Sequence, residues 1–169
     1  MAERLTVMKS GPVTGPKATS IRRGRPGDAH ALRRLLLELG YDPGDARTAD
    51  ETIAQVVRHP EAAVFVAVEG AEVVGYVAMS HRPQMRLGGR LATIDELVVA
   101  ASRREQGLGS RLVAAAVEHA RSLHCLRVDV LQRRTRESYA RDFYQNCGFE
   151  EQNNALMRLT LHQPAPTQR

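Results

Sequence analysis

The stretch from Leu97 to Gly109 has the residue types of an anion-binding site. An apolar strand ends, a short loop follows, and Gly107 and Gly109 stand where a long amphipathic helix begins. The first N–H groups of a helix have no partner within it, and the helix dipole favours negative charge there. Glycine has no Cβ to keep a phosphate from these donors, and Arg103 and Arg104 add positive charge. We therefore expect a phosphorylated ligand at this loop.

Two common phosphate-binding motifs do not fit this loop. The chain has no G-x-x-x-x-G-K-[ST] motif, and Leu112 stands where a dinucleotide fingerprint needs a third glycine. The pattern that fits is R-x-x-G-x-G, from Arg104 to Gly109. The looser form of this pattern, [RQ]-x-x-G-x-[GA], arises by chance in very roughly one chain in six of this length. A glycine-rich helix start without a ligand therefore stays open on this motif alone.

Hydrophobic periodicity predicts the elements around the loop. Strands are expected at 18–23, 63–69, 73–81, 91–99, 126–131 and 155–161, with a polar loop at 82–90. Helices are expected from Pro26 to a stop at Gly40, from a capping box at Thr48 and Glu51 to Pro60, at 107–123 and at 137–146. The second helix would bury Ile53, Val56 and Val57. This order predicts an α/β (α+β) fold with a mixed, mostly antiparallel central sheet flanked by helices.

The length of 169 residues suits one domain. Residues 1–17 are expected to be a disordered extension, 18–161 a single domain and 162–169 a flexible tail. No apolar run reaches the roughly 18 residues of a membrane span, and no apolar segment follows the first charges as in a secretory signal. Two cysteines, Cys125 and Cys147, cannot form a secreted disulfide framework and are expected to be packing residues. These features predict a cytoplasmic protein.

The chain is basic and rich in arginine. It holds 24 Lys and Arg against 19 Asp and Glu, a net charge of +5, and only Lys9 and Lys17 are lysines. Arginine dominance fits either a GC-rich coding genome or a polyanionic ligand. The charges form no run, so nucleic acid is not indicated as a partner. The six histidines show no i, i+4 pair, so no metal site is expected.

A second motif lies some thirty residues beyond the first. Residues 140–149 read A-x-x-F-Y-x-x-x-G-F, and the strand before the loop reads Ile94-Asp95-Glu96-Leu97-Val98-Val99. With R-x-x-G-x-G, these motifs stand in order and on suitable elements. Over about residues 18–161 the chain resembles the GNAT superfamily of acetyl-CoA-dependent N-acetyltransferases. The resemblance implies the GNAT-like acyl-CoA N-acyltransferase fold and acetyl-CoA as cosubstrate.

The resemblance also implies roles for individual residues. Backbone groups of Leu97, Val98 and Val99 would pair with the pantetheine arm as an extra strand would. The Tyr144 hydroxyl would lie near the CoA sulfur. Two positions depart from the family pattern, with Ala101 where proline is frequent and Glu137 where asparagine is frequent. The pyrophosphate would be held by backbone N–H groups of six residues: Arg104, Glu105, Gln106, Gly107, Leu108 and Gly109.

Acetyl transfer to an amine requires a base. An alkyl amine has a pKa near 10.4, so its neutral form at pH 7 costs roughly 4 to 5 kcal/mol. Asp95 and Glu96 lie on the strand beside the implied thioester site, where the family often keeps a carboxylate. Neighbours on a strand point to opposite faces, so we expect at most one to face the substrate, and favour Asp95. Two ordinary charges at a strand rim are the alternative.

The acceptor is expected to be a primary amine of a small molecule. Five carboxylates crowd the segment between the first two helices, which would favour a cationic amine: Glu38, Asp42, Asp45, Asp50 and Glu51. A solvated loop explains them equally well. An acetyltransferase of protein amines and a non-catalytic CoA-binding regulator are the alternative functions. We also expect a homodimer, as in many members of the family.

Overall fold

The computed structural model describes residues 18–131, 141–153 and 155–161 of the chain. They fall into two compact units, one ending at Tyr139 and one beginning at Ala140. The second unit contains helix α4 (Arg141–Asn146). Within the described part of the first unit the elements are, in order, β1 (Thr19–Arg23), α1 (Ala29–Glu38), α2 (Ala46–Arg58), β2 (Ala62–Glu69), β3 (Glu72–Gln84), β4 (Gly89–Val99), α3 (Leu108–Ser122) and β5 (Cys125–Val130).

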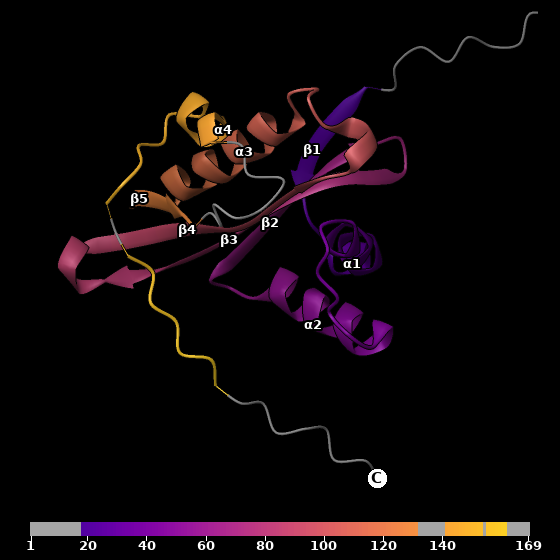
Figure 1. The fold of residues 1–169 in the computed structure, drawn as a ribbon, viewed down its shortest axis with the longest axis horizontal. Coiled ribbons are helices and arrows are strands. Elements are labelled where there is room, and N and C mark those ends of the chain that lie inside the picture. The colour runs from indigo at the N-terminus through magenta and orange to yellow at the C-terminus, as the bar shows by residue number, and fades with distance from the viewer. Residues whose placement is uncertain (1–17, 132–140, 154, 162–169) are drawn as a thin grey trace, which may run out of the picture. The chain divides into compact units, whose positions relative to one another are not determined.

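The first unit is built on a five-stranded sheet with the strand order β1-β2-β3-β4-β5. The first four strands pair antiparallel, and β4 pairs parallel with β5. Helix α3 connects these two parallel strands, as a crossover must. Helices α1 and α2 cover one face of the sheet and α3 the other (Figure 1). The expected mixed, mostly antiparallel sheet flanked by helices is confirmed.

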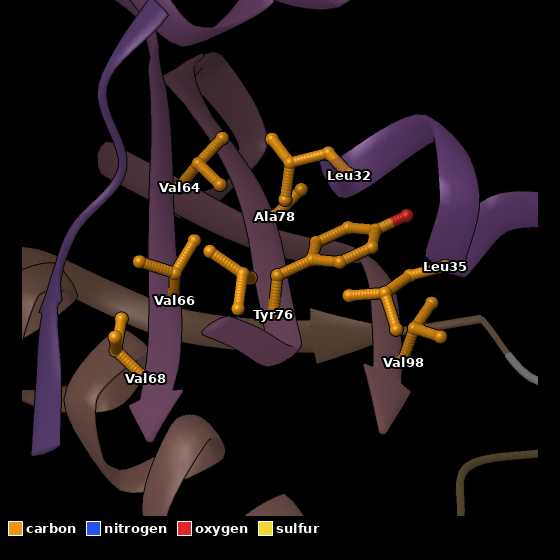
Figure 2. Close-up of a cluster of buried hydrophobic side chains, with 9 residues drawn as sticks. Leu32, Leu35, Val64, Val66, Val68, Tyr76, Ala78 and Val98 are labelled. Atoms are coloured by element: carbon orange, nitrogen blue, oxygen red, sulfur yellow. The ribbon is translucent and has the colours of Figure 1, made fainter. Parts of the chain in front are cut away.

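The core on the α1 side forms because strand and helix periodicities each expose an apolar face. Alternate residues of β2 meet Leu32 and Leu35 of α1. Figure 2 shows the Tyr76 ring of β3 extending from the sheet toward these two leucines. Tyr76 is only 2% exposed, although it carries a polar hydroxyl. A buried phenol needs a hydrogen-bond partner, which makes this ring important for the site.

The ends of α1 and α2 are fixed by local hydrogen bonds. After α1, the Gly40 N–H donates to Leu37 O and the Tyr41 N–H to Leu36 O, a Schellman motif that suits the left-handed φ of +81° at Gly40. The expected stop at Gly40 is confirmed. Helix α2 begins at Ala46, earlier than expected, because Asp45 caps it by accepting from the Thr48 N–H at 3.0 Å. The capping box predicted at Thr48 is therefore wrong.

The apolar stripe expected on α2 is only partly buried. Ala49 is the buried residue of this helix, and Ile53 and Val57 pack against the core from partly buried positions. Val56 is 45% exposed. The helix therefore does not close completely over the sheet.

Two predictions about strands were wrong. The polar stretch 82–90 is not a loop, because β3 runs to Gln84 and β4 starts at Gly89 around the short turn Met85–Leu87. Pairs such as Arg82 with Leu91 extend the ladder, and this pairing outweighs the polar composition. Residues 155–161 form no strand, because no strand of the described sheet pairs with them. The final helix was expected at 137–146, of which 137–140 lie outside the described residues.

Among the described helices, none combines the length and the apolar character that crossing a bilayer requires.

Candidate functional site

A β-bulge in β4 shapes the centre of the candidate site. Ala78 of β3 pairs with Glu96, but the next residue, Met79, pairs with Ile94. One step on β3 therefore corresponds to two steps on β4, and Asp95 is the extra residue. A bulge breaks the strict alternation of side chains between the two faces of a sheet.

Glu96 is held by the buried tyrosine of the neighbouring strand. The Tyr76 hydroxyl donates to Glu96 Oε2 at 2.8 Å. Burial, then the nearby Glu96 charge, raises the pKa of Tyr76 far above its ordinary value. The phenol therefore stays protonated and donates to the carboxylate throughout the working pH range. This contact fixes the carboxylate on the α1 and α2 side of the sheet.

Asp95 reaches the same face. It accepts a hydrogen bond from Ser80 Oγ at 3.2 Å. Tyr76, Ala78 and Ser80 alternate along β3 and so share one face. Both carboxylates therefore lie on that face, because the bulge removes the strict alternation on which the sequence expectation was based; which of them faces the substrate stays a prediction. Partial removal from water raises the pKa of Asp95 above its ordinary value, which makes it a stronger base than a free aspartate.

A cavity of about 280 Å³ opens between α1, α2 and the sheet. Glu96 and Tyr76 line it, whereas Asp95 is not among its lining residues. The partly exposed face of α2 forms one wall. The remaining lining residues are Leu32, Leu36, Pro43, Thr48, Ala49, Thr52, Ile53, Val56, Val57, Val64 and Ala78.

The carboxylates between the first two helices have local partners. Asp50 Oδ1 accepts from Arg33 Nε at 2.7 Å, and Asp45 caps α2. Asp42 accepts from the Gly44 N–H, Glu38 from the Ala101 N–H at 3.4 Å, and Glu51 pairs with Arg47 within α2. Asp50 and Glu51 thus pair with arginines, whereas the other three carboxylates accept N–H groups and keep their charge. Local structure accounts for this acidic segment as well as a cationic acceptor does.

Strand β4 pairs with β5 along only part of its length. The pairing between these parallel strands ends at Ile94 and Val130. From Leu97 to Val99 the strand pairs with β3 alone within the described residues. In an antiparallel pair alternate N–H and C=O groups point away from the partner strand. The three residues expected to meet the pantetheine arm therefore present backbone groups that can pair with an extended ligand.

The loop before α3 has the backbone form of an anion cradle. Glu105 and Gly107 both have left-handed φ values, +61° and +74°, and Gln106 between them does not. Such alternation turns successive N–H groups toward one side. No atom lies within 4 Å of the place where a Cβ on Gly107 would project, so the space beside the loop is open. Leu108 then starts α3, as expected from the sequence.

The arginines beside this loop are partly engaged elsewhere. Arg103 Nε donates to Glu69 Oε2 at 2.8 Å. Arg104 Nε donates to the Val99 carbonyl at 3.3 Å, which ties the loop to the end of β4. The backbone N–H groups, rather than a free cluster of arginines, are therefore the main groups that this loop offers to an anion.

Tyr144 lies in the second unit. Its ring makes edge-to-face contacts with Phe143 at 4.9 Å and Phe149 at 5.5 Å between centroids. Burial raises its pKa to about 12, so the hydroxyl stays protonated at neutral pH. That is the form in which it can donate a proton. Its catalytic role stays a prediction.

Sequence reasoning missed Tyr76, Ser80 and the bulge. A signal for Tyr76 was present, because it is the single phenol in the aliphatic run Val73–Met79 and a buried phenol requires a polar partner. Nothing in the local sequence announces the bulge. In the part of the chain described here, no three His, Cys, Asp or Glu residues gather as metal ligands would.

Comparisons with known proteins define the class of this chain. The model of the acetyltransferase (GNAT) family matches residues 29–149. Glucosamine 6-phosphate N-acetyltransferase 1 of Oryza sativa subsp. japonica is 36% identical over 87 residues, which are 52% of this chain and 50% of that protein. The matched part therefore spans half the length of this relative. The uncharacterized N-acetyltransferase YhfO of Bacillus subtilis is 25% identical over 151 residues, covering 86% of this chain and 99% of that protein.

A solved structure agrees with these relatives. A putative acetyltransferase from Agrobacterium tumefaciens str. C58 superposes with a TM-score of 0.74 at 26% identity, covering 83% of this chain and 99% of that one. The fold is thus that of acyl-CoA N-acyltransferases. The chain belongs to the GNAT family of acetyltransferases.

Proposed function

We propose that this protein transfers an acetyl group from acetyl-CoA to a primary amine of a small molecule, by direct attack in a ternary complex. The observation that carries the proposal is the arrangement along β4. Tyr76 fixes the Glu96 carboxylate. The next three residues, Leu97–Val99, form a strand edge that β5 leaves unpaired in the described residues. Membership of the GNAT family supports acetyl transfer, and the name of the rice relative supports an amine acceptor.

The residues present fit acetyl-CoA. Along Leu97, Val98 and Val99, the backbone groups that point away from β3 suit the amide groups of a pantetheine arm. The left-handed turn at Gly107 leaves open space where a Cβ would project, and the first N–H groups of α3 suit a pyrophosphate. When bound, acetyl-CoA supplies an activated acyl group as a thioester.

The side chains of this chain would then move two protons. Glu96 lines the cavity and is our first choice as the base that takes a proton from the acceptor ammonium, with Asp95 as the alternative. This choice differs from the sequence-based preference because Glu96 lines the cavity and Asp95 does not. Tyr144 would donate a proton to the sulfur as the C–S bond breaks, and the second proton that the nitrogen loses as the amide forms would restore the phenol. The leaving thiol has a pKa near 8.5 and so needs less help than the amine.

Steady-state acetylation of an amine panel, followed by release of free thiol, tests the proposal. We expect Glu96→Gln to lower kcat by about 10²-fold to 10⁴-fold, and Asp95→Asn to do less. The loss should shrink as pH rises, because free amine then accumulates without a base. The reverse ranking would move the role to Asp95. Tight CoA binding without turnover of any amine would indicate the non-catalytic regulator instead.

A further inference from the structure

The cavity next to Glu96 is lined mostly by apolar side chains and carries a single charged group. Nine of its thirteen lining residues are aliphatic or proline. Its polar groups are the hydroxyls of Thr48, Thr52 and Tyr76 and a single carboxylate, that of Glu96. No lysine, arginine or histidine is among the described residues that line it.

The size of the cavity limits what it can hold. A volume of about 280 Å³ corresponds to roughly nine water molecules at about 30 Å³ each. It lies at the lower end of the range of small-molecule pockets. A compact ligand of about that many heavy atoms fills it, and a much larger ligand would extend beyond its walls.

Because the proposed function places the acceptor at Glu96, we propose further that the acceptor is a small primary amine with an apolar body. Its ammonium lies against the Glu96 carboxylate, and its hydrocarbon part packs against α1 and the inner side of α2. Each buried CH₂ group favours such a ligand over a hydroxylated one.

The same lining disfavours other amines. A phosphate placed among these aliphatic side chains would lose its hydration with no cationic partner, which is strongly unfavourable. A polyamine would bring a second ammonium, but only one carboxylate lines the cavity. Nearby Asp45 and Asp50 are engaged by Thr48 and Arg33 and do not replace it. The acceptor therefore differs in chemistry from glucosamine 6-phosphate.

An acetylation assay with four chosen amines tests this inference. The probes are 2-phenylethylamine, ethanolamine, spermidine and glucosamine 6-phosphate, each with acetyl-CoA and the full chain. We expect kcat/KM for 2-phenylethylamine to exceed that of each polar amine at least 10-fold, a difference of about 1.4 kcal/mol in transition-state binding.

A matched pair of variants locates the effect. Val56 lines the cavity at an exposed position, so Val56→Lys adds a charge at its wall without disturbing the core. Gln55→Lys adds the same charge at the preceding residue, which is also exposed but does not line the cavity. We expect Val56→Lys to lower kcat/KM for 2-phenylethylamine at least 5-fold, and Gln55→Lys to change it less than 2-fold.

The outcomes separate the two proposals. Preference for a polar or phosphorylated amine, or equal effects of the two lysine variants, overturns the apolar acceptor and leaves the acetyltransferase intact. Absence of turnover with every amine overturns the proposed function and this inference with it.

Discussion

The hydrogen bond between Tyr76 and Glu96 gives the sharpest test of how the site is built. Tyr76→Phe deletes the hydroxyl that donates to Glu96 Oε2 at 2.8 Å and leaves the buried ring in place. A hydrogen bond to a charged group contributes about 1.5–3 kcal/mol to stability, and its deletion costs most when the remaining partner is buried and left without a hydrogen bond. Here the phenol itself is removed and Glu96 is exposed enough to regain water. We therefore expect a loss of stability at the lower end, about 1–1.5 kcal/mol.

The effect on catalysis should be larger than the effect on binding. Without the phenol, the Glu96 carboxylate can adopt several rotamers, of which few reach the ammonium. We expect kcat to fall about 10-fold with little change in KM for the amine. Urea unfolding followed by circular dichroism measures stability, because the chain has no tryptophan. Initial rates of thiol release measure kcat and KM on the same preparations.

A double-mutant cycle supplies the control. Glu96→Ala removes the acceptor of the same hydrogen bond, so Tyr76→Phe should cost little further stability in that background. A coupling free energy of about 1 kcal/mol is expected between the two positions. Additive effects of the two substitutions, or a Tyr76→Phe variant with unchanged kcat, would refute the argument that the phenol positions the carboxylate.

Three further outcomes are expected. Gly107→Val should weaken CoA binding at least 10-fold, as measured by calorimetry. A left-handed φ of +74° costs a branched residue about 1–2 kcal/mol, and the new side chain would enter the open space beside the loop. As a control, Gly27→Ala should leave the affinity unchanged, because Gly27 has open space around it and no positive φ. Asp28→Asn should lower the free energy of unfolding by about 1 kcal/mol at pH 7, since Arg22 contacts both carboxylate oxygens at 2.8 and 2.9 Å. The hydrogen bond from Arg22 holds the pKa of Asp28 below its usual 3.8, so this stabilisation is complete above pH 3.8. In urea titrations, the free energies of unfolding of wild type and variant should converge as the pH falls through the lowered pKa. A difference that does not depend on pH would contradict the pairing. Tyr144→Phe should lower kcat more than it changes CoA affinity, and an unchanged kcat with rate-limiting chemistry would leave Tyr144 as a packing residue only.

The sequence alone determined the class of fold and the position of the glycine-containing loop before α3. Strand alternation, the apolar face of 107–123 and the glycines at 107 and 109 are local patterns, and local patterns follow from backbone geometry. The parallel β4–β5 pair also follows, because a strand–helix–strand order requires a crossover. The helix-starting loop was therefore correctly expected before α3.

Sequence patterns failed where partners distant in the chain decide the structure. The polar residues 82–84 became strand because β4 lies beside them, and 155–161 have no strand partner in the described structure. Five clustered carboxylates suggested a cationic acceptor, yet each has a donor or an arginine nearby. For Asp50 and Glu38 that partner lies far away in the chain, and only folding brings it within reach. Composition counts charges but does not count their partners.

The arrangement of the catalytic candidates was decided by the tertiary structure. From the sequence, Asp95 and Glu96 are adjacent residues that should diverge. In the sheet, one extra residue on β4 turns both toward Tyr76 and Ser80 of β3. A bulge depends on the register between two strands, and register is set by packing over the whole sheet rather than by the residues at the bulge. The sequence thus determined that both carboxylates lie on β4 directly before Leu97, and the pairing of β3 with β4 decided which one lines the cavity.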